Sequence, residues 1–232
     1  MKPTTERELK LDLSVEFTND LIEQMPKIFE KNGWDCPTRI NMTNFDRYFD
    51  KLLDTGNFLL HSNNSYVRVR KSVWPEKKRE AEFIAYRKLT EAAYGKPAEI
   101  YDYEISVLKT QEITHELLMD YPSELREPFE EAIGSVEHLE SMRLSEIVRL
   151  RCDRVIWPIK VGLADTDVIK IKIDRVVYKS HPMQAFAQIE IDYYSPSLFD
   201  KAAAFVRTLS TFEQSHAGAS TMSKLDRGLS LL

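Results

Sequence analysis

The chain has 232 residues, 43% of them hydrophobic and 30% charged, an ordinary composition for a soluble globular protein and a length sufficient for one large domain. Its 37 acidic and 32 basic residues leave a formal net charge of −5, which argues against a broad basic surface for duplex nucleic acid. Net charge says nothing about placement, so a local basic lining stays open.

The first half of the chain predicts several strands and one helix. Thr18 or Asn19 can cap a helix from about Asp20 to Lys31, because apolar residues recur there at helical spacing. The other elements expected in this half are a strand at Glu6–Leu13, an extended segment at Asn41–Leu53, a hairpin of Phe58–Leu60 with Tyr66–Lys71, a polar turn at Trp74–Glu80, and strands at Phe83–Leu89 and Ile100–Leu108.

The second half changes character after Thr110. Residues 110–145 are rich in Glu and Leu and predict a helical insertion, broken at two prolines. Pro196 opens a C-terminal helix from Ser197 to about Phe212. Strands are expected at Ile147–Trp157, Val168–Tyr178 and Ala185–Tyr194. With about eight strands, no repeat and no linker, we expect a single α+β, mainly β domain over residues 1–232.

Three absences bear on compartment. The two cysteines, Cys36 and Cys152, provide neither a disulfide framework nor a zinc cluster, and reduced thiols are the simpler interpretation. No apolar run approaches the roughly 18 residues of a membrane-spanning helix. Met1 to Glu8 lacks the apolar centre of a signal peptide. We therefore expect a cytoplasmic protein with no membrane partner.

Five short stretches place charge on every second residue with an apolar residue between. They are Glu6–Lys10, Arg68–Arg70, Arg149–Arg151, Lys170–Asp174 and Glu190–Asp192. Alternate residues of a strand point to opposite faces, so each stretch presents one charged and one apolar face. A solvated antiparallel sheet explains such a pattern in general. A sheet closed on itself would instead gather these acids and bases into one polar bore, which suits a polyanion held with a metal ion.

The motifs resemble those of one known family. Glu6-x-Glu8-x-Lys10, then Tyr48-Phe49-Asp50 before Val67-Arg68-Val69-Arg70, then Glu190-Ile191-Asp192 and Ser223-Lys224-Leu225-x-Arg227 match in order and spacing the motifs of the CYTH superfamily, the triphosphate tunnel metalloenzymes. Lys51 replaces the usual threonine, and residues 110–145 do not align by motif. The resemblance implies an eight-stranded antiparallel closed β-barrel, the triphosphate tunnel, with helices packed outside.

The same resemblance implies a metal site. Carboxylates on one strand end can hold Mg²⁺ or Mn²⁺, since these hard cations prefer oxygen ligands. Glu6 and Glu8 supply one pair, and Glu190 and Asp192 complete the site from the other wall. The alternative for a lone pair of this kind is a solvated acidic face.

Several cations must converge on a triphosphate, because it carries about four negative charges. The substrate-binding candidates are Lys10, Arg68, Arg70, Lys88, Arg149, Arg151, Lys170, Lys172 and Lys224. If the strand register is shifted by one residue, Arg154 would face the bore in place of Arg149 and Arg151. Likewise, either Lys88 or its neighbour Arg87 faces the bore, because adjacent residues of a strand point to opposite faces. On the same parity, Cys152 is expected to pack outward.

Two further acids are candidates for catalysis. Glu104 and Asp174 could hold a second metal or orient the attacking water, and a role as partners for neighbouring Arg or Lys is an equal alternative.

We expect metal-dependent hydrolysis of a small triphosphate, with inorganic triphosphate and nucleoside triphosphates favoured. The alternatives are thiamine triphosphate hydrolysis, cyclisation of ATP by a class IV-type adenylate cyclase, and a non-enzymatic polyphosphate-binding module. An RNA 5′ end is a less favoured substrate, and either a monomer or a homodimer is compatible with the sequence.

Overall fold

The computed structural model describes residues 4–89, 98–107, 144–164, 167–212, 218–220 and 222–232. Side chains in parts of these ranges, among them those of Lys88, Leu89 and residues 98–107, fall outside the description. The described strands are β1 (Thr4–Leu13), β2 (Ile40–Asp50), β3 (Ser65–Trp74), β4 (Arg79–Leu89), β5 (Ala98–Val107), β6 (Ser145–Lys160), β7 (Val168–Tyr178), β8 (Ala185–Tyr193) and β9 (Gly218–Ala219). The described α-helices are α1 (Thr18–Lys31), α5 (Phe199–Phe212) and α6 (Lys224–Leu229).

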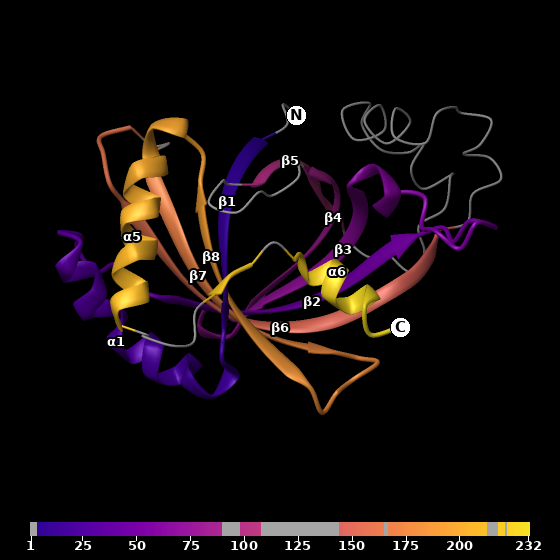
Figure 1. Cartoon of the computed structure of the whole chain (residues 1–232), viewed down its shortest axis with the longest axis horizontal. Coiled ribbons are helices and arrows are strands. Elements are labelled where there is room, and N and C mark those ends of the chain that lie inside the picture. Colours follow the sequence, from indigo (N-terminus) through magenta and orange to yellow (C-terminus); the bar gives the residue numbers. More distant parts are fainter. Residues whose placement is uncertain (1–3, 90–97, 108–143, 165–166, 213–217, 221) are drawn as a thin grey trace.

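The strands form one sheet in the order β5-β4-β3-β2-β6-β7-β8-β1-β9, and every pairing is antiparallel (Figure 1). β5 also pairs with β1, over residues 98–102 opposite residues 4–8. The expected mainly β architecture with an antiparallel sheet and accompanying helices is therefore confirmed at this level.

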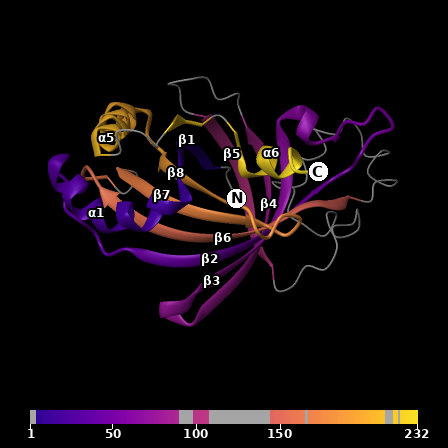
Figure 2. The ribbon, with the colours of Figure 1, turned by 60° about the horizontal axis from the view of Figure 1, so that its bottom comes forward.

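One face of the sheet is apolar and carries two helices. Leu11, Ile171, Ile189 and their neighbours on β1, β6, β7 and β8 form a buried cluster with apolar residues of α1 and α5, such as Phe29. Both views place α1 and α5 together on the β7–β8 side of the molecule (Figures 1 and 2). On β1, β7 and β8, packing the apolar face under helices leaves alternate charged residues, such as Lys10, Lys172 and Glu190, on the concave face.

The other helix lies on the concave side. Figure 2 shows α6 above the inner surface of the curved sheet, away from α5. Leu225 of α6 packs in a second buried cluster with Tyr48, Val148, Tyr178 and other inner-face residues of β2, β3, β6 and β7. The sequence pattern predicted no helix beyond Phe212, so α6 was not predicted.

Strand parity within β6 differs from the prediction. Val148, Leu150 and Cys152 are buried in the inner cluster, whereas Arg149 and Arg151 are exposed on the opposite face. The predictions that these two arginines face the interior and that Cys152 packs outward are therefore wrong. The inner surface at this point is filled by the apolar contacts of α6, so the apolar residues of β6 turn inward there.

Two local predictions are also wrong. The segment at residues 58–60 does not pair with β3; Phe58 makes an isolated bridge with Leu52, and β3 pairs with β2 and β4. Helix α1 begins at Thr18 after a 3₁₀ turn, and Phe17 is its N-cap, so neither Thr18 nor Asn19 caps it. The Thr18 hydroxyl instead donates to the carbonyl of Ser14 at 3.2 Å.

The expected helical insertion at 110–145 falls almost wholly on residues outside the described ranges, which resume at Leu144. Within the described ranges, no helix combines the length and the apolar character needed to cross a bilayer.

Candidate functional site

Charged side chains from six strands and α6 converge on one cavity of about 50 Å³ on the concave face. Its lining is Glu8, Lys10, Tyr48, Tyr66, Arg68, Arg70, Arg87, Arg154, Lys172, Glu190, Ser223, Lys224 and Leu225. The cavity is small because the charges pair across it. A polyanion can enter only if some of these side chains exchange an acidic partner for the ligand.

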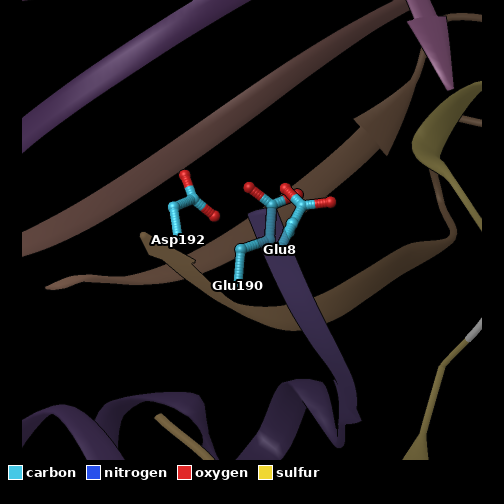
Figure 3. Close-up of side chains that lie close together, drawn as sticks. All are labelled: Glu8, Glu190 and Asp192. Atoms are coloured by element: carbon cyan, nitrogen blue, oxygen red, sulfur yellow. The ribbon is translucent and has the colours of Figure 1, made fainter. Parts of the chain in front are cut away.

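Three carboxylates form an acidic cluster in this region. Glu8, Glu190 and Asp192 each offer an oxygen within 4.8 Å of the others, and all three residues are buried. Cross-strand register explains the cluster, because Glu8 on β1 lies directly opposite Asp192 on β8, with Glu190 two residues along the same face. Figure 3 shows the three side chains extending to the same side of β1 and β8. A set of carboxylate oxygens is the donor set that Mg²⁺ and Mn²⁺ prefer.

Each carboxylate of the acidic cluster has a lysine partner. Lys10 Nζ lies 2.5 Å from Glu8 Oε1, Lys172 contacts Asp192, and Lys224 contacts Glu190. A lysine is a flexible point charge that can move to another partner. The acidic cluster therefore fits a divalent cation, which can take the place of lysine ammonium groups at the carboxylates.

Asp46 is held differently, by a guanidinium. Arg70 Nε and Nη2 donate to its two oxygens at 2.7 and 2.6 Å, and Asp46 is fully buried. Burial alone would raise the pKa of this carboxyl, but Arg70 and the neighbouring Arg68 hold it at about 2. Asp46 therefore stays ionised and fixes the orientation of Arg70, a cavity-lining cation.

Arg154 is held in the same way on the other wall. Its guanidinium donates to both oxygens of Asp174, at 2.6 and 2.5 Å, and to Glu190 at 2.7 Å. Lys224 Nζ adds a contact of 2.8 Å to Asp174. Although burial opposes ionisation, these cations keep the pKa of Asp174 below its usual value. Both oxygens of Asp174 therefore contact Arg154 or Lys224 in this structure.

Lys172 is a cavity-lining lysine whose pKa is lowered from its usual value. Burial, assisted by nearby Arg154, lowers the pKa of Lys172 to about 8, although Glu6 opposes the shift. For Lys10 the balance is the opposite. Burial lowers its pKa, but the nearby carboxylates of Glu8 and Glu190 raise it more, so the pKa of Lys10 is raised overall. Two lysines that line the same cavity therefore differ in how readily they lose a proton.

Five predicted substrate-binding residues lie in the cavity lining, namely Lys10, Arg68, Arg70, Lys172 and Lys224. Lys170 does not; its Nζ donates to the Tyr194 hydroxyl at 2.7 Å and stacks over that ring. Arg149 and Arg151 lie on the outer face, each beside an acid of its own strand.

Among the predicted acids, Glu6 is buried one inner-face position beyond Glu8. Its Oε1 is 3.9 Å from Lys172 Nζ, and it is not part of the acidic cluster. Burial would raise the pKa of Glu6, but Lys172 and Arg87 hold it below its usual value.

For Lys88 on β4 and Glu104 on β5 the structure describes the backbone only. The backbone pairs Lys88 with Ser65 and Glu104 with Ala85. Arg87, the competitor of Lys88, pairs with Tyr66 and lines the cavity.

Sequence reasoning ranked Arg87 and Arg154 second and did not select Asp46. The signal available in the sequence was the odd or even position of each residue along its strand, which determines the face on which its side chain lies. Asp46 is opposite Arg70, and Arg154 is opposite Asp174. Both pairs depend on which strands neighbour one another, which the sequence alone did not provide.

No family model matches the chain, and no curated protein matches its sequence. Among solved structures, the PH1819 protein of Pyrococcus horikoshii OT3 is similar with a TM-score of 0.51 and 12% identity, covering 97% of this chain and 98% of that chain. At this identity the similarity shows a shared fold. The RNA triphosphatase domain of a mimivirus mRNA capping enzyme has a TM-score of 0.46 and 8% identity over 89% of this chain and 88% of its own, too low a score to carry an argument.

Proposed function

We propose that this protein is a divalent-metal-dependent triphosphatase of the triphosphate tunnel type, which hydrolyses a phosphoanhydride bond of a small triphosphate. The observation that carries the proposal is that the acidic cluster, two of whose carboxylates line the cavity, lies beside the cations that converge there. Anion binding alone needs no clustered carboxylates, whereas a metal–triphosphate complex needs both kinds of group.

The fold is compatible with a tunnel. The pairing of β5 with both β4 and β1 supports closure of the sheet around the cavity, as the CYTH resemblance implies. The sheet takes strands from Thr4 to Ala219, which supports a single tunnel domain over residues 1–232.

The cations have two roles in this proposal. Lys10, Lys172 and Lys224 would turn from their carboxylates to phosphate oxygens, together with Arg68 and Arg87 of the lining. The guanidinium groups of Arg70 and Arg154, held by acids, would act as fixed positive charges in the wall. Binding would orient the phosphate chain before any bond breaks.

Glu8, Glu190 and Asp192 would hold the metal ion, which when bound neutralises phosphate charge and orients the phosphate oxygens. The low pKa values of Glu6 and Asp174 make both carboxyls weak bases. The chain's residues would therefore contribute mainly positioning and electrostatic stabilisation, with no covalent intermediate.

The test is phosphate release from inorganic triphosphate, ATP, thiamine triphosphate and pyrophosphate, with Mg²⁺ or Mn²⁺ and with EDTA. We expect metal-dependent release from at least one triphosphate, and losses of about 100-fold or more in kcat for Glu8→Gln and for Glu190→Gln. Glu146→Gln is the matched control, because Glu146 is also in an ion pair on a strand but lies on the outer face.

The outcomes separate the remaining candidates. Cyclic AMP from ATP without phosphate release would identify a cyclase. Binding of triphosphate without any turnover would identify a polyphosphate-binding module. Full activity in both cluster variants would refute the metal assignment.

A further inference from the structure

Lys224 is the cavity-lining cation that lies in a short helix, whereas the other lining cations lie on long strands of the sheet. It is the first residue of α6, a helix of six residues, and so short a helix depends on tertiary contacts for its position. A capping box closes its first turn: Ser223 Oγ accepts from the Asp226 amide at 3.1 Å, and Asp226 Oδ2 accepts from the Ser223 amide at 2.8 Å.

The second oxygen of Asp226 points away from α6. Asp226 Oδ1 lies 2.7 Å from Nε2 of His61, which is 165 residues earlier in the chain. Although burial alone would raise it, hydrogen bonds from His61 and Ser223 hold the pKa of the Asp226 carboxyl at about 2. The carboxylate is therefore ionised and bridges the α6 cap to a distant segment.

That distant segment is itself anchored. The backbone amides of His61 and Leu60 donate to Asp50 at 2.9 Å, and Asp50 is fully buried at the end of β2. The segment then leads directly into β3, which carries Arg68 and Arg70. His61 thus occupies a fixed position on the connection between two cavity strands.

We propose that His61 and Asp226 are positioning residues that hold Lys224 in the cavity, by tying the first turn of α6 to the β2–β3 connection. Lys224 meets Asp174 and Glu190 of the β7–β8 wall. The His61–Asp226 pair therefore holds α6 to the β2–β3 connection while Lys224 of α6 contacts carboxylates on β7 and β8. The role in substrate binding rests on the proposed triphosphatase function.

Other contacts keep α6 folded without this pair. The Tyr178 hydroxyl donates to the Lys224 carbonyl at 2.6 Å, and Arg227 contacts Asp12 of β1. Removing His61 should therefore loosen the first turn of α6 without unfolding the protein.

The first experiment needs no substrate. Lys224 is only 7% exposed, so an acylating reagent should modify it slowly in the wild-type protein. We expect its acetylation rate, measured by mass spectrometry against exposed Lys27, to rise in His61→Ala and to stay at the wild-type value in His181→Ala, the matched histidine control. An unchanged Lys224 rate in His61→Ala would overturn the proposal, whatever the activity of the protein.

The second experiment is a double-mutant cycle on inorganic triphosphate hydrolysis. The His61 and Asp226 side chains are 40% and 37% exposed, so we expect a KM increase of only about two- to fivefold in His61→Ala, with a smaller change in kcat. In a Lys224→Ala background the same substitution should leave KM unchanged, because the effect acts through Lys224.

His61→Gln keeps a side-chain N–H donor and should restore much of the wild-type KM. Equal His61→Ala effects with and without Lys224 would show a merely structural role and overturn the proposal. If the wild-type protein hydrolyses no triphosphate, the proposed function fails, and the acetylation rate of Lys224 still decides the positioning claim.

Discussion

Replacing Asp46 with asparagine tests whether buried ion pairs hold the cavity arginines. Asp46 is fully buried and receives two hydrogen bonds from Arg70. Its pKa falls from 3.8 to about 2, and a shift of this size corresponds to about 2 kcal/mol of stabilisation. Asp46→Asn also leaves the Arg70 charge buried without its partner, so we expect a total loss of about 2–4 kcal/mol in unfolding free energy.

The pH dependence has a definite sign. Because the folded-state pKa of Asp46 is depressed, its contribution is complete above the unfolded value of 3.8 and is lost as the pH falls toward 2. The stability gap between wild type and Asp46→Asn, measured by urea denaturation, should therefore be full at pH 7 and smaller by about 1 kcal/mol at pH 3.

Glu146→Gln provides the matched control. Glu146 also receives two hydrogen bonds from an arginine, Arg149, but the two side chains are 28% and 42% exposed on the outer face. An exposed pair of this geometry should contribute less than about 1 kcal/mol. If Asp46→Asn costs no more than Glu146→Gln, or if its cost does not fall at low pH, the reasoning from burial is refuted.

Three further outcomes are expected. Gly228→Ala should lower the melting temperature and raise the KM for triphosphate, because an added Cβ would lie 2.6 Å from Val148 Cγ1 and push α6 away from β6; a wild-type KM and melting temperature would contradict this packing. Arg149→Ala and Arg151→Ala should leave the KM for triphosphate within about twofold of wild type, since both arginines lie on the outer face, whereas Arg68→Ala should raise it about tenfold or more. Chelation by EDTA should abolish turnover, and added Mg²⁺ or Mn²⁺ should restore it; activity in metal-free buffer would exclude the metal role.

Part of the site follows from the sequence because strand alternation is a local property. Period-two patterning puts Glu8 with Lys10, Arg68 with Arg70 and Glu190 with Asp192 on one face of each strand, whatever the rest of the fold. The structure places all of these residues on the concave face. The bounds of β7 were also predicted as observed, because its alternation is long and uninterrupted.

Side-chain alternation does not predict which face of a strand turns inward where both faces have apolar neighbours. In β6, the inward turn of Cys152 and Leu150 depends on the apolar side chains that α6 brings from the other end of the chain. For the same reason Arg149 and Arg151 face outward, and Arg154 is the arginine of β6 that lines the cavity.

The sequence by itself determined which residues of a strand share a face, since side-chain alternation requires no partner. Only the tertiary structure decided which strands are neighbours, and so which charges meet. Asp46 with Arg70, Asp174 with Arg154, and His61 with Asp226 are ion pairs between segments 20 to 165 residues apart. Such pairs depend on strand order and register, which arise from packing the whole chain and leave no mark in a local pattern.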